Sequence, residues 1–213
     1  MFVLNHSNSI ANSYLADLRN IAVQEDRLRF RTNLERLGVL MAYEVSKTLD
    51  FESKTISTPL KETSVQVPND DIVLIAVLRA ALPFMDGFLK IFDRASVGFV
   101  GAWRKEGGGS IEVALDYVAA PDLNGKTLIL VDPMLATGKS LVRVLNEILK
   151  NGSPKKMHFC SVISAPEGID YVKSNVKMDY QMWTWAVDEK LNEQSYIVPG
   201  LGDAGDLSFG SKL

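Results

Sequence analysis

The sequence predicts an α/β fold in which helices flank a mostly parallel sheet, and three observations lead to this prediction. Short apolar runs rich in β-branched residues, such as Ile72 to Leu78 and Leu128 to Val131, are typical of buried parallel strands. Segments with helical apolar spacing follow these runs, and such alternation is the pattern of α/β domains. The 213 residues are 46% hydrophobic and 23% charged, which suits one well-buried core. We therefore expect residues 1–213 to form a single domain.

The other elements follow from periodicity along the chain. Met1 to Asp50 shows helical apolar spacing and is expected to form helices. Ser57 to Val67 alternates apolar and polar residues, which predicts a short hairpin or an edge strand. Further strands are expected at Ser96 to Trp103, Ile111 to Val118, Met157 to Ile163 and Met182 to Val187, and helices at Phe84 to Ile91, Leu141 to Leu149 and Pro166 to Val176.

Two arginines stand where strands are expected to end. Arg79 follows Ile72 to Leu78, ahead of a helix that begins near Pro83. An arginine in this place is costly to bury unless an anion meets it, so Arg79 is a candidate phosphate contact. Arg104 repeats the arrangement, since it ends another strand before the glycine-rich stretch at 107–109.

The loop after Val131 carries the strongest functional signal. Thr137, Gly138 and Ser140 would bring backbone amides, two hydroxyls and the positive end of a helix dipole together, which suits a phosphate monoester. Asp132 lies at the carboxyl end of the strand, where open α/β sheets bind their ligands. Because a carboxylate repels phosphate, its expected partner is a sugar hydroxyl or a metal ion. The combination indicates a phosphorylated sugar.

Two other interpretations of this loop remain. Asp132-Pro133 before a helix can be a turn with an N-cap and no ligand. Gly138-Lys139-Ser140 matches the end of the P-loop motif, but Pro133 stands where that motif requires its first glycine. This mismatch argues against a nucleoside triphosphatase.

The stretch from Tyr196 to Asp206 resembles no regular element. It contains three glycines, a proline and two acids, which impose a tight backbone path. Such a path can approach a flat ligand and bind it through main-chain groups, although a plain C-terminal loop is the alternative. The density of constrained positions favours binding.

Composition excludes several classes of partner. The formal net charge of -3 and the lack of a Lys/Arg block argue against nucleic acid and an anionic membrane surface. The N-terminus has no basic region followed by an apolar one, and the apolar runs are strand-length, so we expect a soluble cytoplasmic protein. Cys160 is the only cysteine, which excludes an intrachain disulfide.

From about Arg27 onward, the chain resembles the uracil phosphoribosyltransferase family. The match rests on Val131 to Gly138, on Ser164 to Gly168, and on Tyr196 to Asp206, with Phe209-Gly210 after it. The resemblance implies a type I phosphoribosyltransferase domain with N-terminal helices and a C-terminal hood that binds the base. It also implies magnesium-dependent transfer of the 5-phosphoribosyl group from phosphoribosyl diphosphate to uracil, a step of pyrimidine salvage that gives UMP and diphosphate.

The resemblance further implies roles for individual residues. Asp132 would hold the ribose hydroxyls, and Arg79 and Arg104 would neutralise the diphosphate. Backbone groups would pair with uracil, and Asp203 would lie near the diphosphate and its Mg²⁺ and serve any proton relay. The catalytic set is Asp132, Arg104 and Asp203, and the substrate-binding set is Arg79, Arg104, Asp132, Pro133, Met134, Leu135, Ala136, Thr137, Gly138, Lys139, Ser140, Ile197, Gly202, Asp203 and Ala204.

The chain departs from the family pattern at four places, one of which is Glu189-Lys190, where the family usually has another pair before Leu191-Asn192-Glu193. Lys139 and Ala81 stand where the family usually has glycine, and Trp103 replaces a tyrosine, so activity or regulation could differ. The family suggests a homodimer or larger assembly and leaves a GTP effector open. Two alternatives are a ligand-sensing regulator on the same fold, which the net charge disfavours, and a transferase for another base, which the C-terminal stretch disfavours. The ending Ser211-Lys212-Leu213 coincides with a peroxisomal signal but also resembles the family's own ending.

Overall fold

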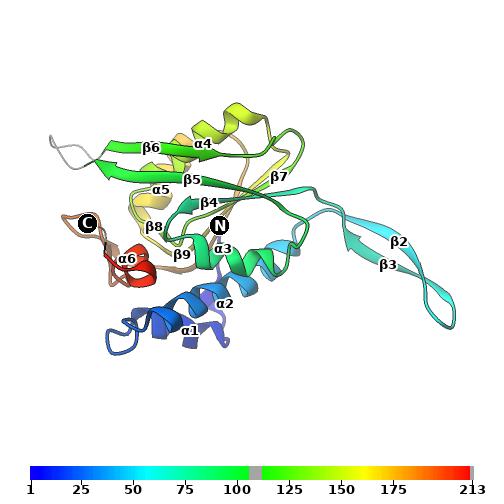
Figure 1. Cartoon of the computed structure of the whole chain (residues 1–213), viewed down its shortest axis with the longest axis horizontal. Coiled ribbons are helices and arrows are strands. Elements are labelled where there is room, and N and C mark those ends of the chain that lie inside the picture. Colours follow the sequence, from blue (N-terminus) through cyan, green and yellow to red (C-terminus); the bar gives the residue numbers. More distant parts are fainter. Residues whose placement is uncertain (106–111, 212–213) are drawn as a thin grey trace.

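A mostly parallel sheet forms the centre of the protein, as the sequence predicts. The computed structural model describes residues 1–105 and 112–211, with only the backbone described for 102–105 and 112–114. Within these residues, the sheet has the strand order β1-β10-β9-β7-β4-β5-β6, with β8 beside β9 (Figure 1). Its strands are β1 (Phe2–Val3), β4 (Ile72–Leu78), β5 (Ser96–Lys105), β6 (Glu112–Ala119), β7 (Thr127–Val131), β8 (Met134–Leu135), β9 (Lys156–Ser164) and β10 (Gln181–Val187). Every pair is parallel except β5 with β6.

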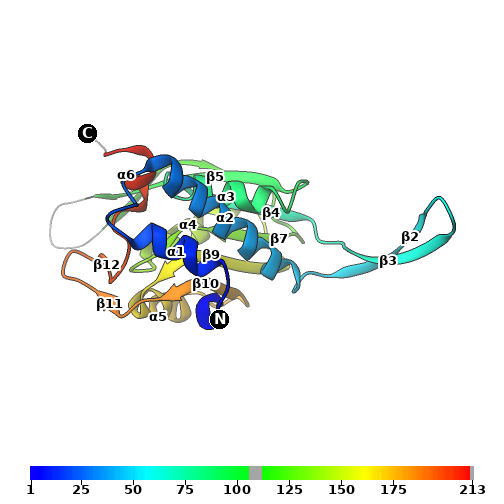
Figure 2. The same ribbon diagram turned by 90° about the horizontal axis from the view of Figure 1, so that it is seen from below.

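Helices cover both faces of this sheet. On one face lie α1 (Ala11–Arg19), α2 (Arg27–Ser46) and α3 (Leu82–Leu89), and on the other lie α4 (Lys139–Ile148) and α5 (Pro166–Asn175) (Figures 1 and 2). Along β4, Leu74 packs with the first group, while Val73 and Ile75 pack with the second. Because both faces are buried, the strand is a continuous apolar run.

The N-terminal section is helical as expected, with one addition. Besides α1 and α2 it contains the short strand β1, which pairs with β10, and the 3₁₀ turn Leu4–His6. A second 3₁₀ turn, Leu149–Asn151, ends the α4 segment. No helix in the described part of the chain is both long and apolar enough to cross a membrane.

Two glycines allow α2 and α3 to approach closely. A Cβ atom on Gly87 would lie 2.1 Å from the carbonyl oxygen of Glu35, and one on Gly38 would lie 2.2 Å from that of Phe84. Both obstacles are backbone atoms, which cannot move without shifting a helix. This contact sets the spacing of the two helices over the sheet.

A two-stranded arm projects from the body of the protein (Figures 1 and 2). It consists of β2 (Phe51–Ser57) and β3 (Glu62–Pro68), which pair with each other and not with the main sheet. The hairpin predicted for Ser57 to Val67 is confirmed, but its first strand begins six residues earlier, so it is not short. Nearly every residue of the two strands is exposed.

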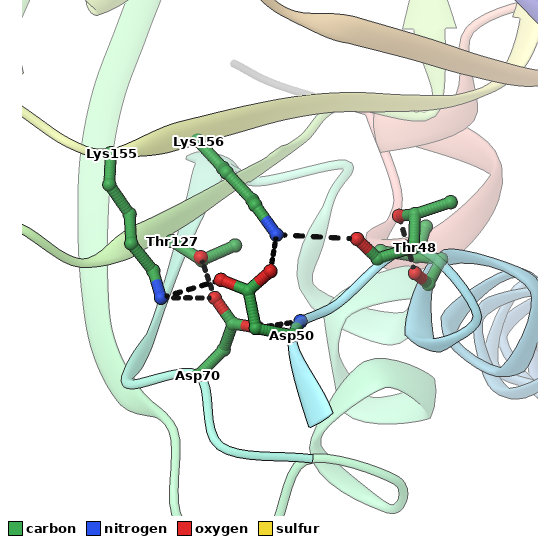
Figure 3. Close-up of polar contacts among 7 residues, drawn as sticks. Thr48, Asp50, Asp70, Thr127, Lys155 and Lys156 are labelled. Atoms are coloured by element: carbon green, nitrogen blue, oxygen red, sulfur yellow. Dashed lines mark hydrogen bonds and ion pairs between the residues drawn. The ribbon is translucent and has the colours of Figure 1, made fainter. Parts of the chain in front are cut away.

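A cluster of charged side chains fixes the root of the arm, as Figure 3 shows. Lys155 contacts the carboxylates of Asp50 at 3.2 Å and Asp70 at 2.8 Å, and Lys156 contacts Asp50 at 2.6 Å. Asp70, whose side chain is fully enclosed, also accepts a hydrogen bond from Thr127 at the start of β7. The cluster therefore joins both ends of the arm to the amino-terminal ends of the central strands β7 and β9.

The C-terminal segment is more regular than the sequence predicts. The stretch from Tyr196 to Asp206 contains β12 (Ile197–Val198), which pairs with β11 (Lys190–Leu191), and α6 (Ala204–Phe209) begins within it. Asp203 starts this helix by accepting hydrogen bonds from the amides of Gly205 and Asp206 at 2.8 and 3.0 Å. Elements of two and six residues are too short to produce a clear periodicity.

Candidate active site

A cavity of about 560 Å³ lies beyond the carboxyl ends of β4 and β7. This is where open α/β sheets bind their ligands. Its walls come from the end of β4, from the loop that precedes α4, from the turn between β11 and β12, and from the start of α6. The lining residues are Val77, Leu78, Ala80, Asp132, Met134, Leu135, Ala136, Thr137, Gly138, Ser140, Leu141, Gln194, Ser195, Tyr196, Asp203, Ala204 and Gly205.

The loop before α4 forms one wall of the cavity. Gly138 is the last residue before the helix and has a φ of 73°, a left-handed conformation that favours glycine. A Cβ atom there would also lie 2.6 Å from the carbonyl oxygen of Gly168, so the loop closes tightly against α5. Thr137 and Ser140 line the cavity beside the first amides of α4. This arrangement can hold a phosphate group.

Asp132 and its neighbour fix the start of this loop. A carboxylate oxygen of Asp132 accepts a hydrogen bond from the Met134 amide at 3.1 Å. The carbonyl oxygen of Pro133 accepts from the amides of Val162 and Ile163, both at 3.0 Å, and so ties the loop to β9. Pro133 therefore supports the wall without lining it, while Asp132 faces the cavity.

The opposite wall includes residues that the sequence analysis did not select. Gln194 and Ser195 line the cavity because the side chain of Asn192 folds the chain into a turn. Its oxygen accepts hydrogen bonds from the amides of Gln194 at 3.0 Å and Tyr196 at 2.9 Å. Asparagine favours such turns, so Asn192 was the signal available in the sequence.

Besides Pro133, four other residues that were expected to bind substrate do not line the cavity. Lys139 is exposed and lies outside the lining, as do Ile197, which is buried, and Gly202. Arg79 also lies outside it, although Leu78 and Ala80 on either side contribute to the wall.

Arg79 already has an anionic partner in the chain. One guanidinium nitrogen donates to the carboxylate of Asp206 at 2.8 Å and to the carbonyl oxygen of Gly210 at 2.6 Å. The carboxylate of Asp206 is therefore an anion of the kind that the sequence leads us to expect beside Arg79. Arg104 lies near the end of β5, opposite Val113 of β6, and its side chain is outside the described residues, as is the glycine-rich stretch that follows.

Two carboxylates, those of Asp132 and Asp203, line the cavity. Within the described residues, no group of three or more histidine, cysteine, aspartate or glutamate side chains could by itself hold a metal ion. Carboxylate oxygens are ligands that Mg²⁺ prefers, and Mg²⁺ commonly binds through one or two of them together with substrate phosphates. A carboxylate in this cavity is therefore a suitable ligand for a magnesium ion that arrives bound to a phosphorylated substrate.

Comparison with known proteins identifies close relatives. A model of the family described as uracil phosphoribosyltransferase matches residues 5–211. A uracil phosphoribosyltransferase of Porphyromonas gingivalis is 43% identical over 99% of this chain and 98% of its own length. One from Methanococcus maripaludis is 45% identical over 92% of this chain and 84% of its own.

Solved structures support the same fold. A protein from Aquifex aeolicus superposes with a TM-score of 0.88 at 33% identity, and the match covers 100% of both chains. A hypoxanthine phosphoribosyltransferase from Staphylococcus aureus superposes with a TM-score of 0.51 at 14% identity, over 91% of this chain and 92% of that one. At so low an identity, the second likeness bears on the fold alone.

Proposed function

The chain belongs to the uracil phosphoribosyltransferase family, and we propose that it transfers the 5-phosphoribosyl group of phosphoribosyl diphosphate to N1 of uracil. The products are UMP and diphosphate. One observation about this chain's own residues supports the assignment: a single cavity has the loop before α4 on one wall and, on the other, Gln194 to Tyr196 together with Asp203 to Gly205. A substrate with a phosphate at one end and a flat base at the other fits between them.

The 5-phosphate would bind where α4 begins. The amides of the first helical turn, with the hydroxyls of Thr137 and Ser140, supply donors aimed at the cavity. Asp132, which follows β7 and lines the same wall, would accept hydrogen bonds from the ribose hydroxyls. Lys139 is exposed, which favours an orientation away from the phosphate.

The diphosphate side would be served by arginines and by Asp203. Arg79 and Arg104 are the proposed cationic partners, and for Arg79 the diphosphate would compete with the carboxylate of Asp206. When bound, Mg²⁺ supplies charge neutralisation at the diphosphate oxygens. Asp203, which lines the cavity, is the residue that would hold it.

Uracil would bind at the C-terminal wall through main-chain groups of Asp203 and Ala204, while Ile197 and Gly202, which lie outside the cavity lining, would shape the segment that carries them. Tyr196 lines the cavity as well and is partly exposed to solvent. Main-chain donors and acceptors suit the alternating carbonyl and N–H groups along the edge of uracil.

Departure of the diphosphate leaves positive charge on C1 of the ribose, so the main requirement is to stabilise the leaving group. An electron-poor C1 needs only a modest nucleophile, and uracil N1 is itself weakly acidic. A strong general base is therefore unnecessary, and Asp203 is our candidate for any proton relay.

The test is to incubate the purified protein with phosphoribosyl diphosphate, Mg²⁺ and each free base in turn. We expect nucleotide formation with uracil and little with cytosine or purines. Diphosphate release without any base, or nucleotide formation only with a purine, contradicts the assignment. Parallel reactions with EDTA test the need for magnesium, and reactions with GTP test whether it acts as an effector.

We also propose that residues 1–213 form one phosphoribosyltransferase domain, that the protein acts in the cytoplasm, and that it forms a homodimer or a larger homo-oligomer. The family match over residues 5–211 supports the single domain. The exposed arm supports an assembly, because an isolated two-stranded hairpin is only marginally stable in water.

A further inference from the structure

An ion pair between the end of α1 and the residue after β10 fixes the wall that is proposed to bind uracil. Arg19, the last residue of α1, forms two parallel contacts with Asp188, at 2.8 and 2.6 Å. The Asp188 side chain is only 4% exposed, and that of Arg19 is 23% exposed. A paired guanidinium and carboxylate in this geometry form one of the stronger polar contacts in proteins.

The same pair holds both backbone polar groups of Gly200. Arg19 donates to the Gly200 carbonyl oxygen at 2.8 Å, and Asp188 accepts from the Gly200 amide at 2.9 Å. Gly200 is buried and has a φ of 66°, and a Cβ atom on it would lie 2.1 Å from the carbonyl oxygen of Ile197. The turn at Gly200 is therefore tight, and these two side chains set its orientation.

Asp188 connects this turn to the rigid part of the fold. It follows β10 directly, and its amide donates to the carbonyl oxygen of Ser164 at the end of β9 at 2.8 Å. The next amide, that of Glu189, donates to Val198 at 2.9 Å. Gly200 is therefore held to the main sheet through Asp188 and to α1 through Arg19.

The cavity wall lies on both sides of the held turn. Tyr196 comes four residues before Gly200 and Asp203 three residues after it, and both line the cavity. A second side chain from the N-terminal section acts on the next residue, since the Gln24 amide, oriented to donate, lies 2.9 Å from the carbonyl oxygen of Leu201. The N-terminal section therefore contacts two consecutive carbonyl groups of this wall.

We infer that Arg19, acting through Asp188 and Gly200, is a positioning residue for base recognition, which makes helix α1 part of the machinery that sets affinity for uracil. This inference rests on the proposed function, because it takes the segment around Gly200 as the base-binding wall. The phosphate loop on the opposite wall is anchored through the Pro133 carbonyl oxygen to the amides of Val162 and Ile163 in β9.

The decisive variant is Arg19→Lys, which keeps the positive charge but loses the planar fork that serves Asp188 and Gly200 together. We expect KM for uracil to rise about tenfold, because a small misplacement of binding groups is enough for such a loss. KM for phosphoribosyl diphosphate should rise by a clearly smaller factor, since its 5-phosphate binds at the opposite wall and only its diphosphate end reaches Asp203.

The matched control is Arg29→Lys. Arg29 pairs with Asp17 at 3.0 Å within the same N-terminal section, but its side chain is 56% exposed and it makes no contact with the turn at Gly200 among the described residues. This variant should leave both KM values and the hydrogen exchange of residues 196–206 unchanged.

Hydrogen exchange of the free protein gives a readout that does not require turnover. In Arg19→Lys, amides of residues 196–206 should exchange faster, while those of residues 132–140 should not. Equal rises in both KM values, or an unchanged KM for uracil with unchanged exchange, would overturn the positioning role. A wild-type protein that does not use uracil would instead overturn the proposed function, and the exchange data would still decide whether Arg19 positions this wall.

Discussion

The carboxylate of Asp132 is the single group whose loss should most affect the proposed reaction. Asp132→Asn removes the charge but keeps an oxygen that can accept the hydrogen bond from Met134. We therefore expect turnover of uracil to fall about 100-fold, as for loss of one preorganised electrostatic contact, with a stability change below about 1 kcal/mol. Steady-state kinetics and thermal unfolding check the two parts. Asp170→Asn, an exposed change on α5, should alter neither, and near-normal turnover in Asp132→Asn would remove this residue from the catalytic set.

His158 should make folding stability fall at mildly acidic pH. It is buried in β9, where its Nδ1 accepts a hydrogen bond from the Trp183 indole at 3.2 Å. Burial, with the nearby Lys156 charge, lowers the pKa of His158 from 6.5 to about 4. Between these values the unfolded chain binds a proton that the folded chain does not, so stability falls as pH drops through the window, by about 3 kcal/mol in total.

Urea unfolding of wild type and His158→Gln at several pH values between 4 and 7 checks this expectation. Glutamine keeps an acceptor for Trp183 but does not titrate. The slope of stability against pH should therefore be smaller in the variant, and equal slopes would assign the acid sensitivity to other groups.

The charged cluster at the root of the arm should control how firmly the arm is held. Burial raises the pKa of Asp70, but hydrogen bonds from Lys155, Thr127 and the Asp50 amide outweigh it and leave the pKa below its ordinary value. Stability from this carboxylate is thus present above about pH 4 and is lost as pH falls through the lowered pKa. The pKa of Lys155 is raised by its bond to Asp70, so its contribution is lost only at strongly alkaline pH.

Asp70→Asn should loosen the arm, with a cost of about 1–3 kcal/mol for weakening the polar contacts of this one enclosed side chain. Hydrogen exchange of residues 51–68 should accelerate, while that of β7 and β9 should stay slow. Asp71→Asn is the control, because the neighbouring carboxylate is 66% exposed and lies 3.9 Å from Lys126. Equal exchange of the arm in both variants would show that the cluster does not hold it.

The close approach of α2 and α3 should make Gly87→Ala destabilising, although helix propensity alone predicts that it stabilises the fold. Alanine is favoured over glycine within a helix by about 1 kcal/mol. In Gly87→Ala, however, the new Cβ would meet a backbone oxygen at 2.1 Å, and overpacking of this kind costs about 1–3 kcal/mol or more. We expect a net loss of stability in chemical denaturation, whereas Ser174→Ala on the exposed side of α5 should be nearly neutral. A stabilised Gly87→Ala would show that the helices separate easily.

The main elements were predictable where burial leaves a clear pattern. The strands β4 and β7 are apolar runs because both their faces are covered, and α4 has an apolar stripe because one side faces the sheet. The length of the arm was not predictable, since its two strands are exposed on both faces and carry no burial pattern. The six-residue α6 is shorter than two full turns and escaped detection for a similar reason.

The candidate site was predictable only in part. Contacts between residues close in sequence could be predicted, whereas contacts between residues far apart in sequence could not. Asp132 and the loop to Ser140 form one local motif, so their joint place in the cavity follows from adjacent residues. The contact of Arg79 with Asp206 joins positions 127 residues apart, and no local pattern indicates it. Long-range contacts of this kind are fixed by how the elements pack.

At the scale of the whole molecule, the arm formed by β2 and β3 does not pack against the rest of the described chain. Large apolar side chains along it are exposed, namely Phe51, Ile56, Leu60 and Val65. If a second copy covers them, light scattering should give twice the chain mass of 23.5 kDa. Replacing residues 53–66 by Asn-Gly, which closes the pair formed by Glu52 and Val67, should then give the mass of a monomer. An unchanged mass after this replacement would place the subunit contact elsewhere.

The link between Arg19 and the C-terminal wall also bears on how the protein is made. Arg19 is synthesised 169 residues before Asp188 and 181 residues before Gly200. The loop at residues 132–140 can form while translation still proceeds, but the opposite wall must wait for both of these late residues. A nascent chain that ends before Asp188 therefore presents Arg19 without this carboxylate and only one wall of the cavity, and competence for the second substrate requires residues 188–206 as well.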